Sequence, residues 1–506
     1  MVSDNKRIAV NTVFLYIRTF LVLAVSLFST RILFQALGET NLGIYNVVGG
    51  VVALMTFLQA ALTVSTGRFI TYELGRNQDS NPQSIYAICF TVHFLVAIIA
   101  LIAGETVGLY IVNNWTSIPL ERMPAANIVY QFSLASFCLN LFRVPLNAVI
   151  IAHERMSVFA YMSILEVVLQ FTVAYAVLKM AGDALVNYAS LHFGVFVILF
   201  AVYWLYVRIR MQQYKMKWLW DASKSKEILF FSGWTLLGST TNTITQQGVS
   251  LLMNNFVGLV ANTALGFANQ VQGAVSKFVN SFTTAFNPQL IKISAQNDKQ
   301  RLHLLMYRAS KFSFVLAYAM ALPIIANMHF LLNLWLGSVP IYTTEFCQLI
   351  LVCSVISATT GPYNTAITAT GNIRNYQLFI SFSFLLDLIC AFLMLMAHLN
   401  PVLVFGSRIM TRGVLNMFIG LHSCKVQIDF DIKDYSRNVL LPIVLTIFLS
   451  IPLVVTVECL MTNEWGRLII SSLAAEFVIV ISLLWIICTK HERNKIVSFV
   501  KSKIMC

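Results

Sequence analysis

The stretch Leu42–Gly50, LGIYNVVGG, indicates how the whole chain is organised, because a related stretch returns 223 positions later at Leu265–Gly273, LGFANQVQG. Each copy follows a long apolar segment and is continued by a segment of helix length. Five of the nine places carry the same residue type: Leu42/Leu265, Gly43/Gly266, Asn46/Asn269, Val48/Val271 and Gly50/Gly273. Self-similarity over this distance predicts two halves that are built alike.

A second echo supports the repeat independently. Pro145–Ala152 aligns with Pro362–Ala369 at an offset of 217, and Pro, Asn, Ile and Ala coincide. A proline inside a helix removes a backbone donor and bends or breaks the helix, so matched prolines are not expected from packing alone. We expect bending or close packing, without contact to a ligand, at Gly43, Gly50, Pro145, Gly266, Gly273 and Pro362.

The composition is that of a membrane protein. Of the 506 residues, 58% are hydrophobic and 11% are charged, and the mean hydropathy is +0.76. Apolar runs of about 20 residues, enough to cross about 30 Å of hydrocarbon, recur along the whole chain. We predict an all-α polytopic membrane protein with about fourteen transmembrane helices, which form two six-helix repeat lobes and two additional C-terminal helices.

The predicted spans are 9–36, 43–66, 85–112, 125–150, 158–180, 185–207, 228–256, 260–287, 309–336, 343–370, 377–397, 401–424, 438–460 and 467–489. The predicted domains are an N-lobe (1–207), a cytoplasmic linker (208–227), a C-lobe (228–424), and two further spans with a cytoplasmic tail (425–506).

The formal net charge of +13 does not indicate a nucleic-acid partner, because the basic residues are spread over short loops between apolar spans. With the N-terminus inside, the outer loops hold only three of the 34 Lys and Arg, namely Arg122, Lys179 and Arg467. This asymmetry predicts that both termini are cytoplasmic. The nine cysteines are scattered without metal-ligand spacing, and we expect no metal and no cofactor.

Several motifs resemble the MOP (multidrug/oligosaccharidyl-lipid/polysaccharide) superfamily, and in particular its polysaccharide or O-antigen flippases. These motifs are Arg31–Leu33, Leu37–Gly38, Leu42–Asn46, Gly67–Phe69 and Ile151–Met156. The resemblance covers nearly the whole chain. It implies two six-helix lobes around a central cavity, a MATE-like fold, and lipid-linked oligosaccharide as the class of cargo for lipopolysaccharide or surface-polysaccharide biosynthesis.

Positive charges inside apolar spans are the first candidates for a site, because a phosphate or pyrophosphate must cross a medium of low dielectric. Guanidinium groups bind phosphate oxygens with two donors. In falling order, the candidates for a cationic cavity are Arg18, Lys277, Arg412, Arg408 and Arg143. The alternative for each is a side chain that reaches the interface from inside the span.

Neutral polar side chains within the spans suit sugar hydroxyls, although contacts between helices are an alternative. The candidates that line the cavity are Asn11, Asn242, Gln246, Gln247, Asn269 and Asn280. The deepest acidic residues, Asp387 and Glu166, are candidates for ion coupling, and Asp387 could instead pair with a buried arginine.

We therefore expect a flippase, not an enzyme, in the bacterial inner membrane that moves undecaprenyl-linked oligosaccharide by alternating access. The expected partners are this lipid-linked cargo, membrane lipids and proteins of polysaccharide assembly. The first alternative is a multidrug exporter of the same fold, driven by sodium ions or protons. A polymerase of lipid-linked sugars is a weaker alternative, because the chain lacks a large outer loop. Motifs of nucleotide binding or hydrolysis are also absent from the sequence.

Overall fold

The computed structural model describes residues 2–53, 55–76, 80–114, 118–487 and 493, and every regular element among them is helical. Within these residues, nine helices are long and apolar enough to cross a membrane, or up to eleven if each of two bent helix pairs is one span. The chain is thus an all-helical, multi-pass membrane protein. The predicted number of fourteen spans stays a prediction. Of the residues after Ile487, only residue 493 is among those that the structure describes.

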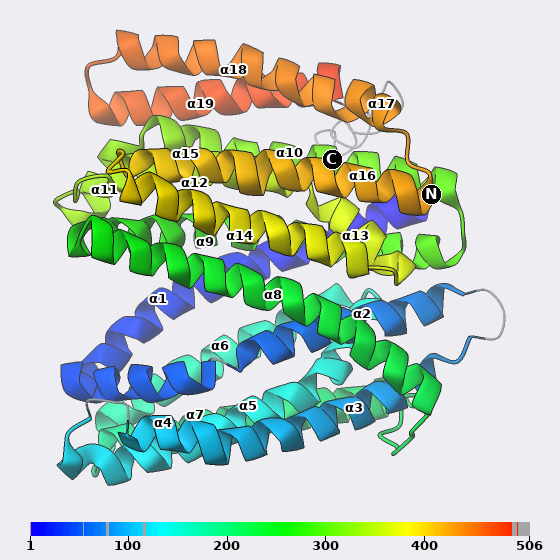
Figure 1. Cartoon of the computed structure of the whole chain (residues 1–506), viewed down its shortest axis with the longest axis vertical. Coiled ribbons are helices and arrows are strands. Elements are labelled where there is room, and N and C mark those ends of the chain that lie inside the picture. Colours follow the sequence, from blue (N-terminus) through cyan, green and yellow to red (C-terminus); the bar gives the residue numbers. More distant parts are fainter. Residues whose placement is uncertain (1, 54, 77–79, 115–117, 488–492, 494–506) are drawn as a thin grey trace, which may run out of the picture. The chain divides into compact units, whose positions relative to one another are not determined.

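The chain divides into two compact units, shown in Figure 1 from blue to red along the sequence. Unit 1 comprises residues 1–240 and 294–296, and unit 2 comprises residues 241–293 and 297–506. The division falls within α8 (Ala222–Phe256). The other helices of unit 1 are α1 (Val2–Ala53), α2 (Thr56–Gly75), α3 (Pro82–Ala103), the π-helical η1 (Gly104–Gly108), α4 (Leu109–Asn114), the 3-10 helix η2 (Leu120–Arg122), α5 (Met123–Ala152), α6 (Met156–Lys179) and α7 (Ala184–Arg210).

Unit 2 holds the remaining helices, and three of its elements have π-helical geometry. Its helices are α9 (Leu259–Ala295), α10 (Lys299–Ala326), α11 (Met328–Leu336), α12 (Thr343–Ala358), α13 (Gly361–Thr370), α14 (Arg374–Met396), α15 (Val402–Arg408), η3 (Ile409–Leu415), α16 (Asn416–Ile428), α17 (Ile432–Tyr435), η4 (Ser436–Leu440), α18 (Leu441–Leu460), α19 (Glu464–Ser482) and η5 (Leu483–Ile487).

Short polar residues begin many of these helices, as the free N–H groups of a first turn require. Asn81 accepts a hydrogen bond from the Ser84 N–H before α3, and Asp183 accepts one from the Leu185 N–H before α7. Gly371, with φ 85°, ends α13 in a left-handed conformation that favours glycine. Local sequence therefore sets many of the helix ends.

The residues of the two sequence echoes play different parts. A Cβ built on Gly43, Gly50, Gly266 or Gly273 would meet no atom within 4 Å, so this structure shows no close contact that requires glycine there. The expectation of bending or close packing at these glycines stays a prediction. The bend in α1 lies instead at Gly38, which has φ 70° and interrupts the helical conformation.

The two echoed prolines differ as well. Pro362 follows a break between α12 and α13, which meet at an angle of 44°. Pro145 lies inside α5, which runs unbroken from Met123 to Ala152. The proline of unit 2 therefore marks a bend between two helices, whereas the proline of unit 1 is accommodated within one helix.

Within unit 1, α1 packs along α6, and α5 packs along α7, α2 and α3 (Figure 1). Tyr130 of α5 lies close to the helix backbone at Gly108, where it is fully buried and donates a hydrogen bond to the carbonyl of Gly104 at 2.6 Å. Small residues allow such approaches in membranes, where helix association depends on van der Waals packing and hydrogen bonds.

A salt bridge in unit 1 connects three segments. Arg122 donates hydrogen bonds to Asp183 at 2.7 and 3.0 Å and to the Asn41 side chain at 2.7 Å. The bond from Arg122 lowers the pKa of the Asp183 carboxyl below its usual value. The same carboxylate caps α7, so it serves both a tertiary contact and a helix terminus.

Within unit 2, α18 pairs with α19, and α10 packs against both α12 and α19. The two last helices are thus part of the packed unit. Aromatic residues fill its interior, with Phe346 and Phe405 at a ring-centroid distance of 4.2 Å and a hydrogen bond between the buried hydroxyls of Tyr363 and Tyr435.

Replacement of Gly108 by alanine should destabilise the protein. A Cβ there would lie 2.1 Å from the Tyr130 hydroxyl, so the tyrosine would have to leave its hydrogen-bonded position. Overpacking of this kind costs about 1–3 kcal/mol. Gly194→Ala is the matched control, because a Cβ at Gly194 meets nothing within 4 Å. Thermal unfolding in detergent should show a lower midpoint for Gly108→Ala alone, and equal midpoints would contradict the packing argument.

Replacement of Asp183 by asparagine should produce a pH-dependent loss of stability. The carboxylate is 33% exposed, so its ion pair contributes at most about 1 kcal/mol. Since the folded-state pKa is lowered, this contribution is complete above the unfolded-state pKa of about 4 and is lost as the pH falls through the folded value. Unfolding midpoints of wild type and Asp183→Asn should therefore converge below about pH 4. A difference that is independent of pH would exclude this account.

Candidate functional site

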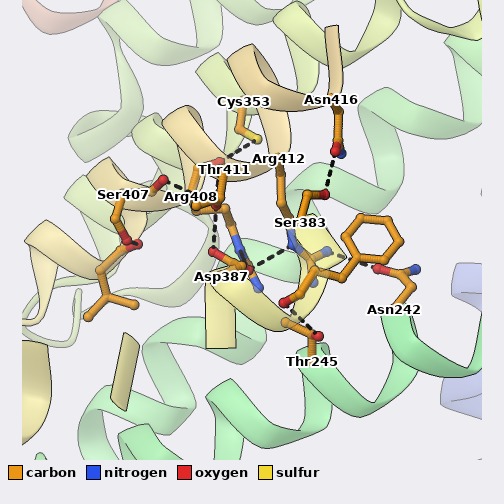
Figure 2. A network of polar contacts seen from close by, with 12 residues as sticks. Asn242, Thr245, Cys353, Ser383, Asp387, Ser407, Arg408, Thr411, Arg412 and Asn416 are labelled. Carbon is orange, nitrogen blue, oxygen red and sulfur yellow. Dashed lines mark hydrogen bonds and ion pairs between the residues drawn. The ribbon is translucent and has the colours of Figure 1, made fainter. Parts of the chain in front are cut away.

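Asp387 lies at the centre of a polar network in unit 2, which Figure 2 shows from close by. Asp387 is buried, with 1% of its surface exposed. Its Oδ2 accepts hydrogen bonds from the Nε of Arg408 at 3.2 Å and from the Nε of Arg412 at 2.8 Å. Its Oδ1 accepts one from the Thr411 hydroxyl at 3.1 Å. The carboxylate therefore connects α14 to the helical segment that runs from α15 through η3.

Arg412 extends the network to α8 and keeps an unused donor. Its Nη1 donates to the Asn242 Oδ1 at 2.9 Å, and its guanidinium carbon lies 4.8 Å from the ring centroid of Phe384. Its Nη2 is buried and has no hydrogen-bond partner among the described residues. A buried donor without a partner costs free energy, more so when it is charged, so this nitrogen is a candidate contact for a ligand acceptor.

The π-helical geometry of η3 favours this arrangement. Arg408 immediately precedes η3, and Thr411 and Arg412 lie within it. All three side chains reach the same carboxylate. Single turns of π-helix occur often at functional sites because they change the direction of side chains within a helix. We interpret η3 as the element that brings both guanidinium groups to Asp387.

Unit 1 contains a cluster of similar composition. Arg143 donates to the Glu166 Oε2 at 3.1 Å, and its guanidinium carbon lies 5.6 Å from the ring centroid of Tyr203. Arg18 interacts electrostatically with the same Glu166 and lies 4.9 Å from the ring centroid of Phe159. The Arg18 Nε is buried without a hydrogen-bond partner among the described residues. Helices α1, α5, α6 and α7 each contribute to this cluster.

Each cluster contains two guanidinium groups and one carboxylate, and so carries a formal net charge of +1. In unit 1 the groups are Arg18, Arg143 and Glu166. In unit 2 they are Arg408, Arg412 and Asp387. An unpaired charge inside the membrane costs free energy. We therefore treat the surplus charge of each cluster as a candidate functional feature. The rings beside the arginines stabilise the cations only partly.

The other predicted site residues lie outside these clusters, apart from Asn242. Lys277 has an exposed side chain on α9, and Gln246, Gln247 and Asn269 are also exposed. Asn11 is buried, and its amide donates to the Glu154 carbonyl at 3.4 Å, so it connects α1 to the turn after α5. Asn280 lines a cavity of unit 2 that is described below.

The sequence did not point to Thr411, Phe384 or Tyr203. A signal was available only for Thr411, which lies three residues after Arg408 and therefore on the same helical face. The aromatic partners come from other helices, and nothing in their local sequence distinguishes them from ordinary apolar positions.

The architecture is that of an all-helical, multi-pass membrane protein. More specifically, the chain has the fold of MATE transporters of the MOP superfamily, as comparison with solved structures shows. An outward-facing multidrug resistance MATE transporter of this superfamily matches with a TM-score of 0.70 at 14% identity, covering 83% of this chain and 95% of that one.

Two further structures agree. A MATE transporter in a bent conformation matches with a TM-score of 0.70 at 14% identity over 84% of this chain and 96% of that one. A MOP-superfamily transporter from Pyrococcus furiosus, for which a binding pocket of reverse polarity suggests a different function, matches with a TM-score of 0.65 at 13% identity over 83% and 95%. No protein-family model and no curated protein sequence matches the chain.

Loss of Asp387 should destabilise the protein far more than loss of Arg412. Asp387→Asn leaves two buried guanidinium groups without a counter-charge, and breaking a buried pair in this way costs about 3–5 kcal/mol. Arg412→Met removes the surplus charge and leaves the Arg408–Asp387 pair intact. Thermal unfolding in detergent should show that Asp387→Asn lowers the free energy of unfolding strongly, whereas Arg412→Met lowers it by about 1 kcal/mol or less. Equal losses would assign Arg412 a purely structural role.

Proposed function

We propose that the protein is a flippase that moves undecaprenyl-(pyro)phosphate-linked oligosaccharide across the bacterial inner membrane for the synthesis of lipopolysaccharide or another surface polysaccharide. In this proposal the protein works by alternating access, and both termini are cytoplasmic. The observation that carries it is the surplus of guanidinium over carboxylate in both clusters, of which the Asp387 cluster is buried and the Glu166 cluster is partly buried.

The surplus charge suits an anionic cargo. A phosphate that leaves water for a medium of low dielectric loses its hydration, and fixed cations offset that loss. Guanidinium offers donors in a planar fork that fits phosphate oxygens. The unpartnered Arg412 Nη2 and Arg18 Nε are donors of this kind. Lys277, whose side chain is exposed, is a further candidate in the proposal.

The second candidate function is a cation-coupled multidrug exporter, which the likeness to a multidrug resistance MATE transporter supports. Such coupling needs a carboxylate that can receive a proton or a sodium ion. Asp387 already accepts two bonds from guanidinium groups and one from a hydroxyl, and Glu166 is paired with Arg143. A coupling cation would have to displace an internal cation at either place, so this candidate ranks second.

Arg412→Met and Arg18→Met should slow transport of the lipid-linked oligosaccharide at least tenfold, because each removes a charged hydrogen bond worth about 1.5–3 kcal/mol. The assay is reconstitution into liposomes with a fluorescent oligosaccharide on the lipid carrier, with a quencher outside that reports sugar exposure on the outer leaflet. Arg76→Met is the matched control, because Arg76 is 43% exposed and pairs with Glu73, which belongs to neither cluster.

The same preparations separate the two candidates. If wild type transports no lipid-linked oligosaccharide but expels cationic drugs along a sodium or proton gradient, the exporter assignment replaces the flippase. Normal flipping by both Arg412→Met and Arg18→Met would refute the cationic clusters as the site.

A further inference from the structure

Unit 2 contains a polar cavity that the Asp387 network does not use. It has a volume of about 300 Å³ and lies between α9, α10, α12 and α13. Its side chains from α9 are spaced three or four residues apart and so belong to one helical face. The polar groups on which the argument rests are Gln272, Ser276, Asn280, Asn287, Ser354 and Asn364. Of the described residues that line it, none carries a charge.

Two hydrogen bonds hold the walls of this cavity together. The Gln272 amide donates to the Ser354 hydroxyl at 2.9 Å and connects α9 to α12. The Thr365 hydroxyl donates to the Asn287 Oδ1 at 2.9 Å and connects α9 to α13. Fifteen residues of helix, or about 22 Å, separate the two attachment points on α9. The cavity is therefore braced by these bonds near both ends of its α9 wall.

The lining keeps both donors and acceptors unused. Within the described part of the chain, the whole amide of Asn280 and the hydroxyl of Ser276 have no hydrogen-bond partner, and the same holds for the Oε1 of Gln272. The Nδ2 groups of Asn287 and Asn364 are likewise free, since only their oxygens accept bonds.

The mixture of unused donors and acceptors in this cavity favours one chemical class of ligand. An anion is best met by donors and a cation by acceptors, whereas a hydroxyl both donates and accepts. Burial of an uncharged, hydroxyl-rich group is tolerated only where its hydrogen bonds are replaced. The volume equals that of about ten waters at ~30 Å³ each, which accommodates a single sugar ring.

The repeat shows that the fold does not dictate this polar lining. Unit 1 has a cavity of about 210 Å³ whose lining residues Gly49, Val52, Ala53 and Thr56 lie 223 positions before Gln272, Val275, Ser276 and Val279 of the unit 2 cavity. Two more of its lining residues, Phe137 and Asn140, lie 217 positions before Ser354 and Ser357. The offsets are those of the two sequence echoes.

The same place is lined differently in the two halves. In unit 1, aromatic rings, among them Tyr45, Phe132, Phe137 and Phe196, border the cavity together with a few amides and hydroxyls. The unit 2 lining contains no aromatic ring, and Ser354 takes the position of Phe137. The unit 2 cavity is therefore the more polar of the two, and its lining suits a ligand of matching chemistry.

We infer that the unit 2 cavity is a subsite for an uncharged sugar ring of the cargo. The inference rests on the proposed function in that the ring belongs to a lipid-linked oligosaccharide. The charged clusters and this cavity then have separate tasks, because the former bind the phosphate and the latter binds hydroxyls.

The test is equilibrium binding to the purified full-length protein in lipid nanodiscs, with two probes. One probe is undecaprenyl-pyrophosphate-linked oligosaccharide, and the other is undecaprenyl phosphate without sugar. Asn280→Leu and Gln272→Leu should weaken binding of the glycosylated lipid about three- to tenfold, as expected for one lost hydrogen bond, and leave binding of the bare lipid unchanged. Gln270→Leu, an exposed glutamine two residues away on α9, should change neither.

Asn280→Leu keeps the test decisive if Gln272→Leu disturbs the wall, because the Asn280 side chain makes no hydrogen bond within the described structure. If wild type binds both lipids and Asn280→Leu binds both equally well, the sugar subsite is refuted while the proposed function stands. Equal weakening of both lipids also refutes it. If wild type binds neither lipid, the proposed function fails, and the subsite fails with it.

Discussion

The Asp387 carboxylate binds together three helical segments of unit 2, since it bridges Arg408 and Arg412 and, through Arg412, reaches Asn242 on α8. A buried charge is tolerated only where a counter-charge and hydrogen bonds replace its hydration. In a membrane this rule is more severe, because water is absent over about 30 Å. The two clusters follow this rule: Asp387 and Glu166 are each paired with arginine, and each cluster retains one surplus positive charge.

This surplus connects structure to function. One guanidinium would be enough to neutralise the carboxylate of each cluster and to connect the helices. The second guanidinium of each cluster is therefore not explained by charge neutrality. The fold is shared with multidrug transporters, and the fold alone does not define the cargo. The proposal of an anionic, sugar-bearing lipid as cargo instead depends on which groups are unused: charged donors in the clusters, and neutral donors and acceptors in the unit 2 cavity.

The sequence repeat corresponds to the positions of two cavities in the structure, not to close packing at its glycines. Its glycines, Gly43, Gly50, Gly266 and Gly273, have no atom close enough to explain them by packing. Its two offsets nevertheless bring the lining of the two cavities into correspondence, although the lining chemistry differs. A repeat preserves the backbone position of a cavity, whereas the side chains in it can change independently in each half. The echoes therefore mark equivalent positions in the two halves, but the cavities at these positions were found only in the structure.

The sequence by itself determined the class of architecture, because its apolar runs of about 20 residues have the length of membrane-spanning helices, which satisfy all backbone hydrogen bonds internally. It also pointed to Arg18, Arg143, Arg408 and Arg412, since any charge within an apolar run is conspicuous. Only the tertiary structure decided that Asp387 and Glu166 are their counter-charges, that Lys277 is exposed, and that Asn280 lines a cavity. These facts depend on which helix faces meet, and helical periodicity specifies the face of each residue but not the neighbouring helix.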